Sequence, residues 1–147
     1  MRRFLDTNVL LYADDLDAGG KREIARTVLA EAMASGEGVL STQVLKEFFA
    51  VATRKLGVDA AVARRKVELL GTMDLVQVDL ELILAGIDLS RLHAVSFWDG
   101  LIVRAAASAG CKVLLSEDLQ HGRVIDGVRI ENPFRGVDAD PGGTPVQ

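Results

Sequence analysis

The stretch FLDTN, residues 4–8, decides the fold, because in it two apolar residues are followed at once by a carboxylate. Apolar residues resume directly afterwards as VLL, residues 9–11. An apolar run that ends in this way indicates a short buried strand that leads into a helix beginning near Asn8. Asp6 then either caps that helix or belongs to a site at the end of the strand. One residue leaves both interpretations open, so the rest of the chain has to decide.

Short apolar runs alternate with longer stretches of helical periodicity along the rest of the chain. The strands are expected at 2–6, 38–41, 74–79, 112–116 and 128–132. The helices are expected at 21–35, 43–56, 58–73, 80–92 and 97–110. Thr42 is the expected N-cap of the second of these helices, and Gly57 is its expected stop. This alternation predicts an α/β layered fold around a mainly parallel sheet.

Length and composition indicate one domain with an aliphatic core. The chain has 147 residues, of which 49% are hydrophobic, and a domain of this size can bury a core without disulfides. We expect the domain at residues 1–134 and a flexible tail at residues 135–147, where Gly, Pro and Asp accumulate. The net charge of −4 argues against a broad basic surface for nucleic acid. A single cysteine and the lack of a long apolar run predict an intracellular, cytoplasmic protein with no membrane contact.

Four acids stand where strands end or where the following helices begin. Asp6 and Asp118 close strands, Glu47 lies one turn into the helix after the second strand, and Asp99 follows Ser96 by three residues at a helix start. Each alone has a simpler interpretation as a cap, a turn residue or a solvated helix edge. Ligands of parallel sheets, however, bind at the carboxyl ends of the strands. The chain order brings all four acids to that edge, which four independent caps would not require.

The chemistry of such a cluster favours a hard divalent cation. Clustered carboxylates repel one another, which raises their pKa values unless a cation neutralises them. A site built from oxygen ligands suits Mg²⁺ or Mn²⁺ better than Zn²⁺. Held by carboxylates, one or two such ions activate water and stabilise the leaving oxygen of a phosphodiester. The acids therefore predict phosphodiester hydrolysis, with the number of ions left open.

Five motifs carry a resemblance to a known family. They are FLDTNVLLYA (4–13), STQVLKEFF (41–49), FWDGLIV (97–103), VLLSEDLQHG (113–122) and IENPF (130–134). In this order they resemble the motifs of PIN-domain ribonucleases, and more closely those of the VapC toxins of VapBC toxin–antitoxin systems. The resemblance covers residues 3–134, and four acidic motifs in order are far more specific than a single DTN.

This resemblance implies an active site, a fold and partners. The acids that it places at the metal are Asp6, Glu47, Asp99 and Asp118. The small polar residues that it places beside them are Thr7, Asn8 and Ser116. It implies a Mg²⁺- or Mn²⁺-dependent ribonuclease toxin with a three-layer PIN-like fold, in which helices flank both sides of a mainly parallel sheet of about five strands. It further implies a homodimer, a VapB-type antitoxin that blocks the site, and contact with DNA only through that antitoxin.

Other classes of protein fit these residues less well. A haloacid-dehalogenase-like phosphatase needs a second Asp two residues after the first, and that position is Asn8 here. A receiver domain needs paired acids after the first strand, where this chain has Asp6 alone. The alternative that stays open is a catalytically silent PIN-fold module that binds RNA or a protein partner.

Several residues outside the four acids have interpretations that the structure can examine. The role of Glu117 is undecided, Trp98 is interpreted as a packing residue, and His93 and His121 as loop residues without a catalytic role. A group of basic residues on the two middle helices either contacts the RNA backbone or forms a solvated face. Its members are Lys46, Arg54, Lys55, Arg64, Arg65 and Lys66.

Overall fold

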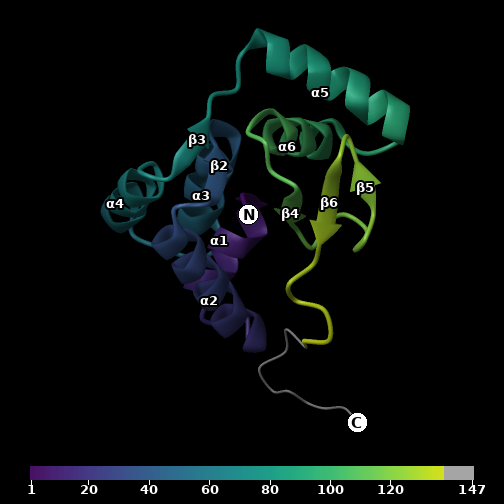
Figure 1. The fold of residues 1–147 in the computed structure, drawn as a ribbon. Helices are drawn as coiled ribbons and strands as arrows, with labels where there is room; N and C mark the ends of the chain where they lie inside the picture. The colour runs from purple at the N-terminus through teal and green to yellow at the C-terminus, as the bar shows by residue number, and fades with distance from the viewer. Residues whose placement is uncertain (138–147) are drawn as a thin grey trace.

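The computed structural model describes residues 1–137, which form one six-stranded sheet flanked by helices (Figure 1). The strands are β1 (Arg3–Leu5), β2 (Gly38–Ser41), β3 (Asp74–Val76), β4 (Val113–Leu115), β5 (Val124–Ile125) and β6 (Val128–Glu131). Their order across the sheet is β3-β2-β1-β4-β6-β5, and the pairs are parallel apart from β5 with β6. The predicted α/β fold with a mainly parallel sheet is therefore confirmed.

The helices lie on both sides of this sheet. They are α1 (Thr7–Asp14), α2 (Gly20–Ser35), α3 (Thr42–Arg54), α4 (Ala60–Leu70), α5 (Leu80–His93) and α6 (Phe97–Ser108). In Figure 1, α1 to α4 gather on one side, and α5 with α6 lies on the other. The chain moves from β1 outward to β2 and β3 and then returns to β4, on the opposite side of β1. Right-handed crossovers in opposite directions place their helices on opposite faces, so β1 and β4 flank the point where the winding reverses.

The core lies on both faces of the central strands. Phe4, Leu5, Val39, Leu40 and Leu114 are each 0% exposed. Strands that are covered on both faces read as continuous apolar runs, because no side of such a strand meets water. This explains why short runs such as those at 38–41 and 113–115 were recognisable as strands.

Two boundaries of α3 differ from the prediction. Ser41, and not Thr42, is its N-cap, and the Ser41 hydroxyl accepts a hydrogen bond of 3.3 Å from the N–H of Val44. Thr42 is the first helical residue, and its hydroxyl accepts from the N–H of Val78 at 3.1 Å. The helix ends at Arg54, before Gly57. Adjacent Ser and Thr can both cap, so the sequence alone could not choose between them.

The strand β5 was missed, which makes the sheet larger than the expected five strands. It pairs with β6 in a tight hairpin through Asp126 and Gly127, whose φ angles are 53° and 78°. Positive φ at both central residues is the geometry of a type I′ turn, for which Asp-Gly is a preferred sequence. The signal was therefore present between Ile125 and Val128.

The last described residues follow β6 and return to the core. Phe134 is buried in the core at 2% exposure. Most of the predicted tail, residues 138–147, lies outside the described residues. Within residues 1–137, no helix combines the length and apolar character needed to cross a membrane.

Candidate metal centre

Asp6 lies at the carboxyl end of β1, where it both caps α1 and faces the neighbouring strand. Its carboxylate accepts a hydrogen bond of 2.7 Å from the N–H of Thr7 and another of 2.7 Å from the hydroxyl of Ser116, which follows β4. The side chain is buried, since the residue is only 5% exposed. The two interpretations of Asp6 are therefore compatible, because one oxygen caps the helix while the carboxylate stays at the sheet edge.

Asp99 and Asp118 approach Asp6 from two other segments. Asp99 stands in the first turn of α6, where its N–H donates to the Ser96 hydroxyl at 3.0 Å. Asp118 follows β4 and accepts a hydrogen bond of 3.1 Å from the side-chain amide of Asn8. One carboxylate oxygen from each of the three acids lies within 4.8 Å of the others. Three of the four predicted acids thus converge at the reversal point between β1 and β4.

Glu47, the fourth predicted acid, lies beside this group rather than within it. One oxygen accepts a hydrogen bond of 2.6 Å from the hydroxyl of Thr7, and the other accepts from the side-chain amide of Gln43 at 3.1 Å. Glu47 nevertheless lines the same cavity of about 330 Å³ as the three converging acids. Its position fits a group that acts across this cavity through a water molecule.

The predicted supporting residues hold these carboxylates in place. Ser116 donates to Asp6 and also accepts from the N–H of Asp118 at 3.1 Å. Thr7 holds Glu47 and Asn8 holds Asp118, as described above. Each of the small polar residues named from the motifs therefore contacts a different part of the acidic group.

The electrostatics of the three converging acids disfavour their charged forms. Burial raises the pKa of Asp6 to about 6, opposed by its hydrogen bonds from Ser116 and Thr7 and reinforced by the nearby Asp118 and Asp99. Burial is also the first cause of the raised pKa of Asp99 and of Asp118, and the charge of Asp99 adds to the effect on Asp118. None of the ion pairs formed by residues 1–137 includes any of these three acids. The chain therefore gathers three carboxylates without supplying a cation to neutralise them.

The donor set fits a hard divalent cation. Asp6, Asp99 and Asp118 offer carboxylate oxygens from three segments, and oxygen ligands are those that Mg²⁺ and Mn²⁺ prefer. A bound cation would also remove the like-charge repulsion that raises these pKa values. The residues present are thus suited to such an ion on both chemical and electrostatic grounds.

Glu117 belongs to a different cluster, although it precedes Asp118 directly. It accepts hydrogen bonds from the Tyr12 hydroxyl and from the Lys21 ammonium, the latter at 2.6 Å. The Lys21 ammonium also lies 4.9 Å from the centre of the Tyr12 ring, and the ring of Phe134 packs edge-on against Tyr12. Glu117 is therefore neutralised within the chain and anchors the segment after β4 to α1 and α2.

The basic group on α3 and α4 is partly occupied by ion pairs. Lys66 pairs with Asp14, and Arg64 and Arg65 both approach Glu68, at 3.6 and 3.5 Å. Arg54 and Lys55 are exposed. The described contacts therefore favour a solvated face for the α4 members of this group.

The two histidines make structural contacts. The backbone carbonyl of His93, the last residue of α5 rather than a loop residue, accepts a hydrogen bond of 2.7 Å from Arg123. The imidazole of His121 accepts one of 3.0 Å from the N–H of Asn132. Neither histidine lines the cavity that the four acids share.

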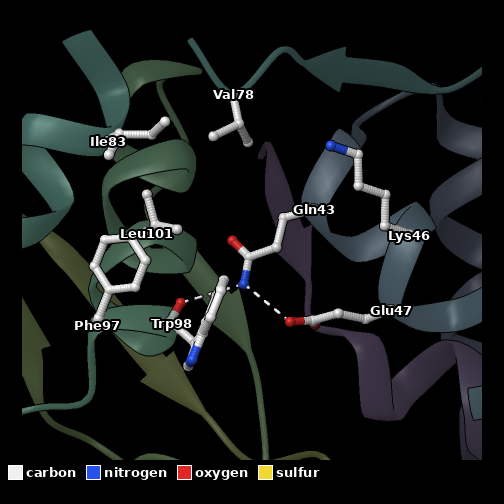
Figure 2. A pocket seen from close by; sticks show the side chains of 8 residues that line it. All are labelled: Gln43, Lys46, Glu47, Val78, Ile83, Phe97, Trp98 and Leu101. Carbon is white, nitrogen blue, oxygen red and sulfur yellow. Dashed lines mark hydrogen bonds between the residues drawn. The ribbon is translucent and has the colours of Figure 1, made fainter. Parts of the chain in front are cut away.

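A second cavity shares a wall with the acidic one, and sequence reasoning missed it. It has a volume of about 470 Å³ and is lined by Gln43, Lys46, Glu47, Val78, Ile83, Phe97, Trp98 and Leu101 (Figure 2). Trp98 packs one edge of its ring against Phe97, but 59% of the residue is exposed, so packing accounts for only part of its surface. The only signal in the sequence was the position of Trp98, directly before a predicted metal ligand at a helix start.

Comparison with known proteins identifies the family of this fold. A family model of the PIN domain matches residues 3–126. A search of curated protein sequences gave no significant match.

Several solved structures resemble this one at low sequence identity. Mycobacterium tuberculosis VapC20, described as a sarcin–ricin loop cleaving toxin, is 20% identical with a TM-score of 0.63, over 79% of this chain and 91% of that chain. A toxin–antitoxin complex from Klebsiella pneumoniae contains a chain that is 18% identical with a TM-score of 0.67, over 90% and 98%. VapBC2 from Rickettsia felis, bound to a promoter DNA fragment, contains a chain that is 17% identical with a TM-score of 0.63, over 90% of this chain and 98% of that chain. At these identities the likeness concerns the fold, and the family model adds the sequence match: the chain belongs to the PIN-domain family.

Proposed function

We propose that this PIN domain is a metal-dependent ribonuclease, a VapC-type toxin that hydrolyses phosphodiester bonds of RNA. One observation carries the proposal: Asp6, Asp99 and Asp118 converge within 4.8 Å without any cation from the described chain. A fold that maintains three unneutralised carboxylates at one edge retains them at a cost in stability. Binding of a catalytic cation would explain why the chain keeps these destabilising carboxylates together.

Each residue of the site has a distinct part in this proposal. Asp6, Asp99 and Asp118 would hold Mg²⁺ or Mn²⁺, and when bound the ion supplies Lewis-acid stabilisation of phosphate oxygens and a more acidic water. The carboxylate of Glu47, fixed by Thr7 and by Gln43, orients the water that attacks phosphorus. Ser116 and Asn8 keep two of the metal-binding carboxylates in a single orientation, as the outer contacts of metal ligands commonly do.

An acidic protein can bind RNA at such a site because positive charge is supplied locally, at the site itself. The net charge of −4 gives no general attraction to phosphate, so the bound cation and a few basic side chains would contact the backbone. Lys46 is the member of the basic group that lines the cavity beside Glu47. Specificity then depends on the shape of the RNA and on exposed bases near the site.

The proposed partners are a second copy of the chain and a VapB-type antitoxin. Leu80, Leu84 and Ile87 are 68%, 53% and 38% exposed, and their spacing places them on one face of α5. An exposed apolar face of this kind supports a homodimer. One of the similar structures is described as a toxin–antitoxin complex and another as VapBC2 bound to a promoter DNA fragment. We infer that an antitoxin blocks this acidic site in the cytoplasm and provides the only link to DNA.

The proposal is tested by incubating antitoxin-free protein with total cellular RNA and Mg²⁺ or Mn²⁺, beside the Asp99→Asn variant. We expect discrete cleavage products with the native protein and a loss of about 100-fold or more in the variant, since the loss of an outer contact alone commonly costs 10–100-fold. Contaminating ribonucleases would act equally in both samples, so only the difference counts. Equal cleavage by the two proteins would overturn the assignment.

The alternative function is a silent binding module for RNA or a protein partner. It predicts no cleavage and no metal binding by either protein. Metal binding by the native protein without cleavage of any extracted RNA would instead direct the search to a structured substrate that the extract lacks.

A further inference from the structure

The side chain of Gln43 separates the acidic cavity from the neighbouring one, and its orientation is fixed. Its side-chain NH₂ group donates to the Glu47 carboxylate at 3.1 Å and to the backbone carbonyl of Trp98 at 3.4 Å. Both partners can only accept hydrogen bonds, so the NH₂ group must face them. The carboxamide oxygen of Gln43 is consequently directed the other way.

That oxygen has no hydrogen-bond partner among residues 1–137, although Gln43 is only 8% exposed. Figure 2 shows it pointing away from Glu47 toward the part of the cavity that carries Leu101. Buried polar atoms are almost always paired, and an unpaired acceptor beside a cavity requires an explanation. A ligand that brings an N–H group into the cavity would provide the missing partner.

The remaining walls of this cavity are mainly apolar and partly aromatic. Val78, Ile83, Phe97 and Leu101 line it, and Trp98 stands at its rim with 59% of its surface exposed. A volume of about 470 Å³ lies within the range of ~300–1,000 Å³ that is typical of small-molecule sites. Exposed side chains change rotamer within nanoseconds, so the indole of Trp98 is free to admit a planar ligand and cover it.

The cavity is also continuous with the proposed chemistry. Gln43, Glu47 and Trp98 line both the apolar cavity and the acidic one. Lys46, one residue before Glu47, places an ammonium group at the apolar cavity. A chain whose phosphate lies at the acids therefore has its adjoining base within reach of this second space.

We infer that the cavity between Gln43 and Trp98 binds a nucleobase of the RNA strand next to the scissile phosphate, an inference that rests on the proposed function. Trp98 offers a stacking face, and the oxygen of Gln43 accepts an N–H group of the base. An apolar side chain from a protein partner would fill the same space but would leave that oxygen unpaired. A nucleobase supplies both a flat face and an N–H donor.

The experiment uses the intrinsic fluorescence of Trp98, which is the single tryptophan of the chain. Native protein in Mg²⁺ is titrated with AMP, CMP, GMP and UMP, which carry a base and a phosphate but no bond to cleave. We expect saturable quenching by at least one nucleotide and none by ribose 5-phosphate, which lacks the base. Concentration-dependent fluorescence of the protein alone, without any response to nucleotides, would show that a second copy covers Trp98 and would overturn the inference.

Variants then separate the base site from the catalytic site. Gln43→Met is expected to weaken nucleotide binding by about 10-fold, the upper range for one lost hydrogen bond. Phe49→Leu is the matched control on the same helix, because Phe49 is 39% exposed and lines neither cavity. Equal nucleotide affinity of native protein and Gln43→Met would overturn the role of Gln43.

The RNA cleavage assay gives an independent reading of the two proposals. Trp98→Leu is expected to raise KM by about 10-fold or more, in line with the loss of one stacked base, with a smaller change in kcat. Cleavage by the native protein without any quenching would overturn the base site and leave the nuclease standing. If the native protein neither binds metal nor shows cleavage that Asp99→Asn abolishes, the nuclease is overturned, and with it the base site that depends on it.

Discussion

Glu117 and Asp118 are adjacent in the chain, yet they lie in opposite electrostatic surroundings. Glu117 meets the ammonium of Lys21 at 2.6 Å and the hydroxyl of Tyr12. Asp118 has a carboxylate oxygen within 4.8 Å of those of Asp6 and Asp99, and among residues 1–137 its side chain accepts only the neutral amide hydrogen bond from Asn8. An acid that the chain neutralises itself contributes to structure, whereas acids that it leaves unneutralised stay electrostatically unfavourable until a cation or a proton binds.

The contrast between these two clusters also separates their energetic roles. The Lys21 and Glu117 side chains are 14% and 20% exposed, so their attraction is only weakly screened by solvent. Burial raises the pKa of Asp6 to about 6, which means that its charged form is disfavoured in the metal-free fold. One cluster should therefore stabilise the protein and the other should destabilise it until a cation binds.

Chelation of divalent cations is expected to have the largest effect on the acidic cluster. We expect exhaustive chelation with EDTA to abolish RNA cleavage, because three carboxylates repel a phosphate group when no cation neutralises them. Added Mg²⁺ or Mn²⁺ should restore cleavage, as measured by gel analysis of a defined RNA. Cleavage that persists after chelation would contradict the metal mechanism.

Thr7→Val is expected to reduce cleavage by about 10-fold or more while the fold remains. The substitution removes the hydroxyl that holds Glu47 at 2.6 Å, and outer contacts of this type commonly contribute 10–100-fold. Thr53→Val is a matched control, since the Thr53 hydroxyl bonds only the backbone of its own helix, with the Phe49 carbonyl at 2.8 Å. Similar cleavage rates for Thr7→Val and native protein would remove Glu47 from the proposed mechanism.

Asp6→Asn is expected to stabilise the metal-free protein at pH 7 by about 3 kcal/mol, as judged from the size of the pKa shift. The unfolded carboxyl titrates near its ordinary pKa of 3.8, while in the folded protein its pKa is about 6. The folded state therefore binds the proton more tightly, and the free energy of unfolding falls as the pH rises from about 4 to about 6.

Urea unfolding of both proteins at several pH values, in the presence of EDTA, measures this difference. The gain in the free energy of unfolding from Asp6→Asn should shrink toward pH 4, where the folded native protein carries Asp6 in its protonated, neutral form. A variant that is less stable than the native protein at pH 7 would show that Asp6 is not electrostatically unfavourable.

Lys21→Met is expected to destabilise the protein by about 1–2 kcal/mol. It leaves Glu117 without its cation, an effect between those of fully buried and surface ion pairs. Urea unfolding in EDTA gives the free energy of unfolding, and Lys55→Met, in which an exposed lysine is replaced, is the control. A loss equal to that of the control would mean that the Lys21 pair contributes nothing.

Much of this fold could be predicted because its strands are covered on both faces. The runs at 38–41 and 113–115 stand out as apolar segments, and the acids that follow strands mark the carboxyl edge of the sheet. The strand β5 was missed because it has two residues, too few for a hydrophobic pattern. Its Asp126-Gly127 turn was the signal that should have been used.

The candidate site also has a part that the sequence predicts and a part that it does not. The acids and their small polar neighbours occur in motifs, so their approach to one another followed from chain order. The separation of Glu47 from the other three acids depends on hydrogen bonds from Thr7 and Gln43, which no pattern in the sequence records. The exposure of Trp98 depends on how α6 packs against its neighbours. The sequence does not reveal this exposure, because an aromatic residue in an apolar stretch reads as a buried one.

The most direct test of the central claim is calorimetric titration of the antitoxin-free protein with Mn²⁺. We predict saturable binding by the native protein, equal binding by Glu117→Gln, and binding weakened at least tenfold in Asp99→Asn. This result would place the cation at the unneutralised acids and not at their neutralised neighbour. Equal affinity of native protein and Asp99→Asn, or no binding by the native protein, would contradict the account.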